Sequence, residues 1–506
     1  MAVLGQSTVY TLFSSTAKWQ TEALAIECGD RHWTYGQLLD TVDRMATVLA
    51  SHGIEPGDRI AILSQNCAEY TLLQLASGRI GAIVSCLNWR LATEELRHCI
   101  DLVEPKLFFV SARFQTHFDA LEHTKATAIA MEACLSLAAS SQPDQRVPFS
   151  DAEGGFLLLN TSGTTGLPKA ALISHRAEIA RMATLRMDLK IEADDGYLAW
   201  SPMYHIGGTE HSLSSLMMGA SVIIVDGLDV DAICTAIGRH RLGWLLLMPA
   251  TIEPLLTRLR ETNTQPMGVR AVGCMADLVP ASQIAEVTTF FTAPFVNSFG
   301  ATETGLPPAT RHLIPVGEVP IELSKQSSSL CEFRLIDEDG LDVMAGEVGE
   351  IVVRGPTLFS GYWNAPEVNA KDFREDWFHM GDLLRQTSSG GFEFVGRSKY
   401  MIKSGGENIY PAEIERVLLA DARIAEAAVV RKRDPKWGEI VAAFIARSPT
   451  VGANELLGAD IEKVCREKLA GYKRPREIHF IAFDDFPRSD SGKIIREALE
   501  NRLDKS

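Results

Sequence analysis

The feature of this sequence that most constrains its fold is an alternation of short apolar runs with stretches of helical periodicity. The apolar runs are of β type and lie at residues 59–64, 81–86, 107–111, 222–225 and 244–248. Parallel strands that are buried on both faces read as continuous apolar runs, and helices connect them. The alternation therefore predicts an α/β protein with a largely parallel sheet that is covered by helices on both sides.

The length of the chain and its charge distribution predict more than one domain. Its 506 residues exceed the ~250–300 residues at which a single hydrophobic core stops growing. Residues 397–506 contain 21 Lys+Arg and 18 Asp+Glu, a net charge of +3, whereas residues 1–396 carry −19. We therefore expect a separate C-terminal domain that faces an anionic ligand, with the boundary at residues 397–399.

Local signals predict several further elements. A capping box at residues 34–37 opens a run of apolar residues at helical spacing that ends at Gly53, so a helix is expected there. The stretch between the strands expected at 350–354 and 392–395 is rich in Gly, Pro, Trp and Asp, which favours a meander of turns. In the C-terminal unit we expect helices near 411–419 and 460–469 and strands near 426–430, 441–446 and 478–483.

The composition excludes several classes of protein. A net charge of −16 argues against a protein whose main affinity is for nucleic acid or for an anionic membrane. The nine cysteines are scattered and form no C-x-x-C pair, which indicates reduced thiols rather than disulfides or a zinc site. No apolar run approaches the ~18 residues of a membrane helix, and residues 1–20 lack the pattern of a signal peptide. We therefore expect a soluble, cytoplasmic protein without an integral membrane segment.

The most informative motif is FLLLNTSGTTGLPK at residues 156–169, in which an apolar strand leads into four hydroxyls, two glycines and a lysine. Glycines let backbone N–H groups turn toward a ligand, hydroxyls donate hydrogen bonds, and the Lys169 ammonium adds positive charge. These properties are typical of a polyphosphate cradle. The motif is not a Walker A loop, because Lys169 follows Pro168 and precedes Ala170. The alternative is a surface turn rich in Ser, Thr and Gly.

Four further segments place glycines beside side chains that can bind ligands. In VNSFGATETG, residues 296–305, the Glu303 carboxylate is a candidate Mg²⁺ ligand, since hard cations prefer carboxylate oxygens. In WFHMGD, residues 377–382, the Asp382 carboxylate can accept both hydroxyls of a ribose. The other two are GRSKYMIKSGGENIYPAE at residues 396–413 and PRSDSGKI at residues 487–494. Each alone is explained as a turn, a hinge or a solvated charge, but the five in this order are not.

In this order the segments resemble the signatures of the adenylate-forming superfamily of acyl-CoA synthetases, nonribosomal-peptide adenylation domains and firefly luciferase. The resemblance extends over nearly the whole chain. Within the superfamily, PMYHIGG at residues 202–208 is similar to the P-x-x-H-x-x-G element of the acyl- and aryl-CoA synthetases, which makes His205 a candidate catalytic residue. The implied α/β fold has a large N-terminal, multi-layer domain with mixed sheets and a small, mobile α+β C-terminal domain. The implied parts are an ATP- and acyl-binding domain at 1–396, a hinge at 397–399 and a C-terminal domain at 400–506.

The resemblance implies an ATP-dependent acid–CoA ligase, with fatty acid metabolism as one expected context. The carboxylate would attack the α-phosphate of ATP to give acyl-AMP and pyrophosphate, and the thiol of CoA would then displace AMP. Both reactants of the first step are anionic, so catalysis would rest on positioning and charge neutralisation. The implied cofactors are ATP, Mg²⁺ and coenzyme A as a co-substrate. The implied partner is a small-molecule carboxylic acid, and a homodimer is compatible with the sequence.

The same resemblance implies roles for individual residues. Thr302 would contact the α-phosphate region, Glu303 would bind Mg²⁺, and Lys493 would bridge the carboxylate and the α-phosphate as the key cation of adenylation. Lys399 matches the hinge about which the small domain rotates between the two half-reactions. The β- and γ-phosphates would be held by Thr161, Ser162, Gly163, Thr164, Thr165, Gly166 and Lys169. The other cofactor-binding residues would be Ser298, Phe299, Gly300 and Ala301 at the adenine, Asp382 and Arg397 at the ribose, and Gly405 and Gly406 in the loop of the pantetheine path, with Lys403 and Asn408 beside it.

Three segments depart from the pattern of the family. Met380 stands where relatives usually have Thr before Gly-Asp, and the Ser-Val-Gly-x-Pro stretch is matched only loosely by residues 315–320. With the prolines aligned, VGCMADLVP at residues 272–280 places Met275 and Ala276 where the family has two glycines beside the adenine and the acyl group. A methylene mismatch in such a pocket costs ~1–3 kcal/mol. The added volume therefore predicts a short, medium or compact cyclic acid and disfavours long linear fatty acids.

Two alternative functions stay open. An acyl-AMP ligase would load a carrier protein instead of CoA, and a non-catalytic homologue would sense a nucleotide or an acyl group without turnover. The presence of both Lys493 and Glu303 counts against the non-catalytic homologue. A luciferase-type oxygenase is not expected, because the chain ends in Leu-Asp-Lys-Ser and not in the peroxisomal Ser-Lys-Leu.

Overall fold

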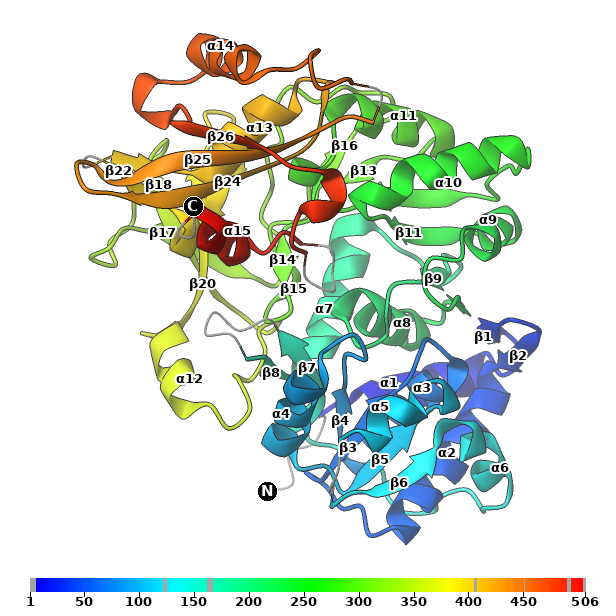
Figure 1. Ribbon diagram of the computed structural model, residues 1–506. Helices are drawn as coiled ribbons and strands as arrows, with labels where there is room; N and C mark the ends of the chain where they lie inside the picture. Colours follow the sequence, from blue (N-terminus) through cyan, green and yellow to red (C-terminus); the bar gives the residue numbers. More distant parts are fainter. Residues whose placement is uncertain are drawn as a thin grey trace. The chain divides into compact units, whose positions relative to one another are not determined.

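The computed structural model of the chain describes residues 6–121, 125–161, 167–404, 407–449, 451–488 and 493–503. The chain divides into two compact units, whose helices and strands are labelled in Figure 1. The first unit comprises Met1–Glu332 and Val353–Phe378, and the second comprises Phe333–Val352 and His379–Ser506. Each unit has hydrophobic clusters of its own.

A six-stranded sheet forms one part of the first unit (Figure 1). Its strand order is β6-β5-β3-β4-β7-β8, and neighbouring strands are parallel except for β7 and β8. The apolar runs predicted at 59–64, 81–86 and 107–111 form β3, β4 and β5, so these three predictions are confirmed. The strands are β3 Arg59–Leu63, β4 Ile83–Cys86, β5 Leu107–Val110, β6 Thr127–Ala130, β7 Gly155–Thr161 and β8 Lys169–Ser174. The helices of this part are α3 Ala68–Ile80, α4 Thr93–Val103, α5 Gln115–Asp119 and α6 Cys134–Ala139.

Two further sheets of the first unit each end in an antiparallel edge strand. One has the order β2-β1-β10-β9 and the other the order β11-β12-β13-β16, in which only β2 and β16 pair antiparallel. The run predicted at 222–225 forms β10, and β11 begins two residues before the run predicted at 244–248. The strands are β1 Leu24–Cys28, β2 Arg31–Thr34, β9 Tyr197–Ala199, β10 Val222–Ile224, β11 Leu242–Leu246, β12 Val269–Gly273, β13 Phe295–Val296 and β16 Leu313–Ile314.

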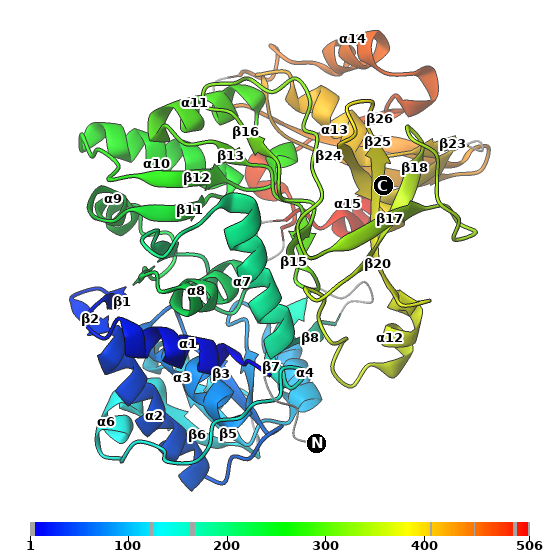
Figure 2. The same ribbon diagram turned by 180° about the vertical axis from the view of Figure 1, so that it is seen from behind.

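Helices pack on these sheets as the alternating pattern predicts. Figure 2 shows α7 and α8, which pack against each other, and α9, α10 and α11 beside β11 and β12. Side chains of α9, α10 and α11 form one hydrophobic cluster with those of β11 and β12. The predicted large multi-layer α/β domain with mixed sheets is therefore confirmed. These helices are α7 His175–Leu189, α8 Ile206–Met218, α9 Val230–Arg239, α10 Pro249–Glu261 and α11 Ala281–Phe291.

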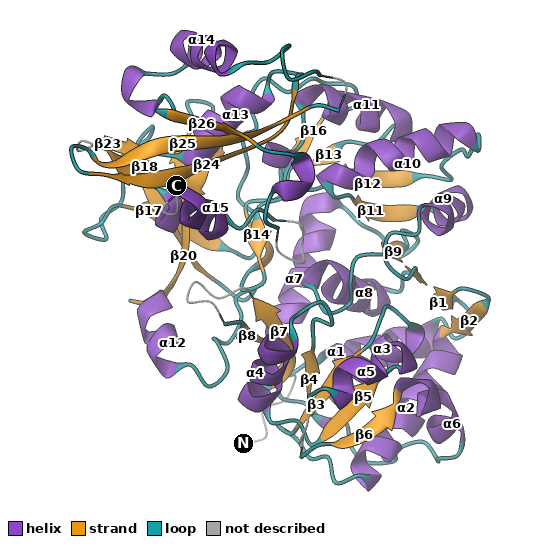
Figure 3. Cartoon of the chain, viewed as in Figure 1, coloured by secondary structure: helices purple, strands orange, loops and turns teal. Residues whose placement is uncertain are grey.

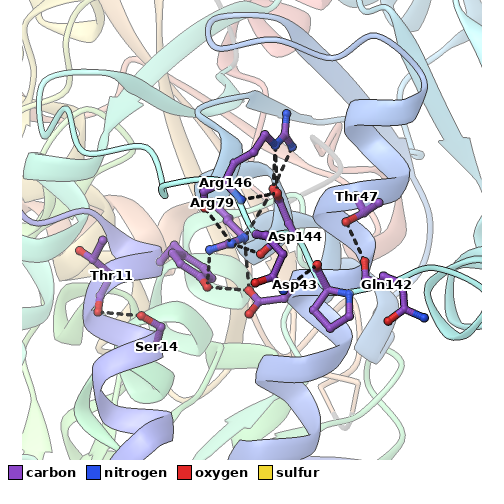
Figure 4. A network of polar contacts seen from close by, with 11 residues as sticks. Thr11, Ser14, Asp43, Thr47, Arg79, Gln142, Asp144 and Arg146 are labelled. Atoms are coloured by element: carbon purple, nitrogen blue, oxygen red, sulfur yellow. Dashed lines mark hydrogen bonds and ion pairs between the residues drawn. The ribbon is translucent and has the colours of Figure 1, made fainter.

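A polar network joins the first three helices, α1 Val9–Trp19, α2 Tyr35–Ser51 and α3 (Figure 4). The hydroxyl of Tyr10 donates to Asp43 Oδ1 at 2.5 Å and accepts from Arg79 Nη1 at 2.7 Å. Arg79 Nε lies 3.3 Å from Asp43 Oδ1 and 3.7 Å from Asp144 Oδ2. The buried guanidinium thus connects the helices to the segment that follows α6. The capping box predicted at residues 34–37 is present at the start of α2, which ends just before Gly53.

The second unit begins with a sheet that differs from the sequence prediction. Its order is β17-β18-β20-β19, with β21 paired to β20. The strands predicted at 350–354 and 392–395 are β18 and β21, but the intervening stretch contains a helix and the ten-residue strand β20. Gly381, at φ +70°, bends β20 without ending it, because the strand pairs on both sides of this residue. The elements of this sheet and of the intervening stretch are β17 Glu332–Ile336, β18 Val348–Arg354, α12 Pro366–Asp372, β19 Phe373–Arg374, β20 Trp377–Gln386 and β21 Phe392–Arg397, of which α12 and β19 belong to the first unit.

The remainder of the second unit is the α+β unit that the sequence predicts (Figure 3). Its strand order is β23-β22-β25-β24, and β26 pairs in parallel with β25. The fifth predicted element, at 478–483, is shorter than expected, because β26 ends at Phe480 and a 3₁₀ turn follows. The elements are β22 Ile402–Ser404, β23 Glu407–Ile409, α13 Pro411–Leu419, β24 Ile424–Asp434, β25 Gly438–Arg447, α14 Gly458–Lys468, β26 Glu477–Phe480 and α15 Arg496–Leu503. Among the described residues, no helix combines the length and the apolar composition that a bilayer crossing needs.

Candidate functional site

The two ends of the predicted phosphate cradle belong to β7 and to the edge strand β8 of the six-stranded sheet, which pair antiparallel. Thr161 is the last residue of β7 and pairs directly with Lys169, the first residue of β8. The two ends of the motif are therefore held side by side by the strand pairing. Its central residues, Ser162, Gly163, Thr164, Thr165 and Gly166, lie outside the described residues.

The Lys169 ammonium lies between an aromatic ring and a carboxylate. Its Nζ is 4.6 Å from the centroid of the Tyr362 ring and 3.8 Å from Asp372 Oδ2. A cation over an aromatic face is stabilised by the quadrupole of the ring. The sequence did not single out Tyr362 or Asp372, because a tyrosine and an aspartate in a turn-rich stretch have no diagnostic spacing.

Tyr362 also contacts the second predicted motif. Its hydroxyl donates a hydrogen bond to Glu303 Oε1 at 2.7 Å, and the backbone N–H of Phe359 donates to the Glu303 carbonyl at 2.9 Å. Two predicted ligand residues, Lys169 and Glu303, are therefore brought together through one tyrosine. The segment that carries Tyr362 therefore contacts both Lys169 and Glu303.

Residues 300–308 form a tight hairpin in which β14 Gly300–Ala301 pairs with β15 Gly305–Pro308. A Cβ atom at Gly300 would lie 2.0 Å from the Gly305 carbonyl oxygen, so no other residue fits there. The N–H of Ala301 donates to Thr304 Oγ1 at 3.0 Å, which closes the turn that carries Thr302 and Glu303. Phe299 is buried before this hairpin, and Ser298 precedes it. The predicted adenine and α-phosphate residues thus share one rigid hairpin.

His205 caps the N-terminus of α8. Its Nδ1 accepts a hydrogen bond from the N–H of Gly207 at 3.5 Å. A Cβ atom at Gly208 would lie 2.4 Å from the carbonyl oxygen of Pro202, so the helix can approach this segment only with glycine there. The spacing of the P-x-x-H-x-x-G element therefore has a local steric cause, which fixes the position of the imidazole.

The unusual segment at residues 272–280 lies beside the adenine motif. The N–H of Ser298 donates to the carbonyl of Cys274 at 3.3 Å, and the N–H of Ala276 donates to Asn297 Oδ1 at 3.3 Å. Ala276 is buried and Met275 is partly exposed. The proximity that the family resemblance implies for this segment agrees with these two hydrogen bonds.

A fully buried lysine reinforces the same segment. Lys325 Nζ forms an ion pair with Asp277 and donates to Asn297 Oδ1 at 2.8 Å. Asn297 Nδ2 in turn donates to the carbonyls of Leu323 and Ser324 at 3.0 and 3.2 Å. The network joins three separate stretches of chain. A single lysine in a serine-rich run gives no sequence signal, so the prediction missed it.

Asp382 and Arg397, the predicted ribose residues, are direct cross-strand partners in β20 and β21. Asp382 Oδ1 lies 2.8 Å from Arg397 Nε, and the side chains are 4% and 44% exposed. The strand pairing brings together two residues from separate motifs. The carboxylate is therefore oriented by the guanidinium in a nearly dry site.

The remaining predicted residues belong to the second unit. Lys399 Nζ lies 3.2 Å from Glu497 Oε1 on α15, and Lys403 pairs with Asn408 across β22 and β23. Gly405 and Gly406 lie outside the described residues. Lys493 is exposed and precedes α15. The predicted hinge residue, Lys399, and the helix that follows Lys493 are thus in direct contact.

Comparison with known proteins agrees with the order of the motifs. A family model of the AMP-binding enzymes matches residues 13–363, and a model of the AMP-binding enzyme C-terminal domain matches residues 413–493. Indoleacetate–CoA ligase of Aromatoleum aromaticum is 34% identical over 490 residues, which are 94% of each protein. Feruloyl-CoA synthase of an Amycolatopsis species is 31% identical over 488 residues, 96% of this chain and 97% of the relative.

A solved structure gives the same result for the fold. o-Succinylbenzoate CoA synthetase of Bacillus subtilis, in complex with its acyl-adenylate intermediate, superposes with a TM-score of 0.85 at 27% identity and covers 98% of this chain and 99% of its own. The family resemblance and the fold class predicted from the sequence are therefore confirmed. The chain belongs to the AMP-binding enzyme family.

Proposed function

We propose that this chain, an AMP-forming acid–CoA ligase, activates a compact aromatic carboxylic acid and transfers it to CoA. The observation that carries the assignment of the site is the contact between Lys169, Tyr362 and Glu303. It brings a cation from the phosphate motif and a carboxylate from the adenine motif to one tyrosine. Both residue types are needed for a nucleotide polyphosphate with its counterion.

In the first half-reaction a carboxylate oxygen of the acid attacks the α-phosphorus of ATP, and the bond to pyrophosphate breaks. Thr161 and Lys169 hold the β- and γ-phosphates, together with Ser162, Gly163, Thr164, Thr165 and Gly166. Thr302 orients the α-phosphate, and Lys493 neutralises the two anions that must meet. Because carboxylate and phosphate repel each other, placing these cations lowers the barrier mainly through electrostatics and positioning.

The donor set fits a magnesium ion held partly by the substrate. Mg²⁺ in nucleotide sites is bound by one or two carboxylates and by phosphate oxygens. Among the described residues, no group of three or more His, Cys, Asp and Glu side chains forms a metal cage. Glu303 would supply the protein carboxylate, which Tyr362 orients through Oε1. When bound, the ion would neutralise charge on the polyphosphate.

In the second half-reaction the thiol of CoA attacks the acyl carbon and AMP leaves. Until the thiol attacks, the nucleotide part of the acyl-AMP is held by Ser298, Phe299, Gly300 and Ala301 at the adenine and by Asp382 and Arg397 at the ribose. Lys403, Asn408, Gly405 and Gly406 belong to the CoA path, and His205 belongs to the acyl side of the site. We assign Lys399 as the hinge between residues 1–396 and 400–506, because adenylation and thioester formation need different residues of the small domain.

The substrate class follows from the stiffness of the 272–280 segment. The Ala276 N–H bond to Asn297 and the pair of Asp277 with Lys325 tie this segment to two others. If this segment lines the acyl pocket, moving it to admit a long acyl chain costs free energy, since packed interiors resist changes of even one methylene. The relatives named for indoleacetate, ferulate and o-succinylbenzoate act on acids with an aromatic ring. An aryl or arylalkanoic acid is therefore favoured over a long fatty acid.

The test is the release of AMP and pyrophosphate with a panel of short, medium, long, branched and aromatic acids. We expect aromatic acids to give the highest kcat/KM and CoA to give a thioester. A carrier-loading enzyme would instead release pyrophosphate but form no thioester with CoA, and a non-catalytic homologue would bind ATP without releasing pyrophosphate. A preference for palmitate over all aromatic acids would contradict the proposed substrate class.

A further inference from the structure

Arg181 is one of the largest fully buried side chains among the described residues. It lies on α7, and each of its three nitrogens contacts a different segment. Nη1 is 2.7 Å from Glu210 Oε2 on α8, Nε donates to the Thr357 carbonyl at 2.9 Å, and Nη2 donates to the Thr302 carbonyl at 3.2 Å. One guanidinium therefore connects two helices, shown packed together in Figure 2, to the turn that carries Glu303.

The hairpin is also shaped to fit this side chain. Gly305 has φ +75°, and a Cβ atom there would lie 2.7 Å from Arg181 Cδ. Any other residue would displace the arginine. The 300–305 hairpin thus touches Arg181 at two points, through the Thr302 carbonyl and through the bare backbone of Gly305.

The charge balance around Arg181 is that of a single ion pair. Glu178, also fully buried on α7, has no hydrogen-bond partner for either carboxylate oxygen among the described residues. Burial and then the negative charge of Glu210 raise the pKa of Glu178 well above its usual value, although Arg181 opposes this. Burial thus favours the neutral form of Glu178, and Glu210 is the carboxylate that pairs directly with Arg181.

A buried ion pair is a poor device for stability, because an apolar pair of similar volume is often as stable or more so. The contacts of Arg181 with three segments are better explained by the positions in which they hold those segments. Arg181 donates to the carbonyls of Thr302 and Thr357, which belong to two different segments. The same two segments also contact each other through the hydrogen bond from Tyr362 to Glu303. A guanidinium is suited to this because its donors form a rigid fork, which an ammonium lacks.

We propose that Arg181 is a positioning residue that fixes the Thr302–Glu303 turn against the 357–362 segment, so that the Glu303 carboxylate meets the magnesium–ATP complex in one orientation. The inference rests on the proposed function and deepens it. Arg181 itself touches neither ATP nor the acid. Its effect reaches the ligand through a backbone carbonyl on one side and the Tyr362 hydroxyl on the other.

The decisive measurement is the dissociation constant of ATP, obtained by calorimetry with and without Mg²⁺, for Arg181→Lys and for the double variant R181M/E210M. A lysine has one nitrogen in place of three and cannot reproduce the rigid fork, so we expect Arg181→Lys to weaken ATP binding about tenfold with Mg²⁺ and much less without it. The double variant removes both charges and leaves none unpaired. We expect it to keep its melting temperature within a few degrees and still to lose the effect of Mg²⁺.

Arg79→Lys is the matched control, because Arg79 is also buried and paired with carboxylates in the same unit. It should lower the melting temperature without changing the effect of Mg²⁺ on ATP binding. The inference is overturned if R181M/E210M, or Arg181→Lys where the double variant does not fold, binds ATP as the wild type does under both conditions. A wild type that binds ATP but turns over no acid in the panel would contradict the proposed function and leave the comparison of dissociation constants valid.

Discussion

The hydroxyl of Tyr362 donates to the Glu303 carboxylate across 2.7 Å, although the two residues are 59 positions apart in the chain. The ring of the same tyrosine lies under the Lys169 ammonium. One side chain thus contacts a carboxylate and an ammonium group that belong to two different motifs.

Tyr362→Phe separates these two contacts, because the ring remains while the hydroxyl is lost. A hydrogen bond to a charged group contributes about 1.5–3 kcal/mol. We therefore expect the Mg²⁺ concentration for half-maximal pyrophosphate release to rise about 10- to 100-fold. Titration of Mg²⁺ at saturating ATP measures this. Tyr362→Ala, which also removes the ring from Lys169, should in addition raise KM for ATP. Equal behaviour of the two variants would show that the ring contributes nothing, and a Tyr362→Phe variant that behaves like the wild type would show that the hydroxyl contributes nothing.

Lys493→Ala should abolish only the first half-reaction. In the proposed function the ammonium neutralises two anions during adenylation, so its loss is expected to slow acyl-AMP formation by several orders of magnitude. Acyl-AMP supplied from outside should still react with CoA. Rapid-quench assays of the two half-reactions test this, with Lys463→Ala on the surface of α14 as a control for general effects. Equal loss of both rates would remove Lys493 from its assigned role.

Met275→Gly should widen the range of acids. Removing the Met275 side chain from the 272–280 segment should enlarge the proposed acyl pocket. Each methylene that the pocket then accommodates contributes ~1–3 kcal/mol to binding. The ratio of kcat/KM for a long linear acid to that for an aromatic acid is expected to rise at least tenfold, with KM for ATP unchanged. Met267→Gly, at an exposed methionine, is the control. An unchanged length profile would mean that the acyl pocket is lined elsewhere.

His175 should make the protein less stable in acid. The imidazole stacks on Phe156 with centroids 4.6 Å apart, and its burial lowers the pKa from 6.5 to about 3. The folded state therefore keeps it neutral, while the unfolded chain binds a proton below pH ~6.5. One such group removes roughly 2 kcal/mol of unfolding free energy between pH 8 and pH 5, at about 1.36 kcal/mol per pH unit.

The variant His175→Asn keeps an acceptor near the Val9 N–H but does not titrate, so the loss of stability in this pH range should shrink. Urea unfolding at pH 8, 6 and 5 measures the difference. The exposed His52→Asn is the control and should follow the wild type. Identical pH profiles for wild type and His175→Asn would refute the assignment.

The strands and helices with a clear hydrophobic period could be predicted, because the spacing of apolar residues along the chain shows which side chains are buried. The run at 107–111 became β5, with all four residues buried, and the box at 34–37 became the cap of α2. Strand β20 was not predicted because Gly381 and Asp382 within it are typical of turns. Pairing with β18, β19 and β21 makes this stretch a strand.

The motifs of the site could be named from the sequence, but their contacts could not. Glu303, Asp382 and Lys169 lie in segments of recognisable type. Tyr362, Lys325 and Arg181 act through partners that are far apart in the chain, and no periodicity or spacing encodes such contacts. Long-range packing decides them, so they become visible only when the segments are assembled.

The enclosure of Lys325 has a chemical consequence for an enzyme that makes acyl-adenylates. A mixed anhydride of this kind is an electrophile, and a neutral amine close to it would be acylated. Lys325 is fully buried, and its nitrogen is paired with Asp277 and bonded to Asn297. An ammonium held in this way has no lone pair for attack. The lysine that ties Asp277 to Asn297 is therefore protected from acylation by the reactive intermediate.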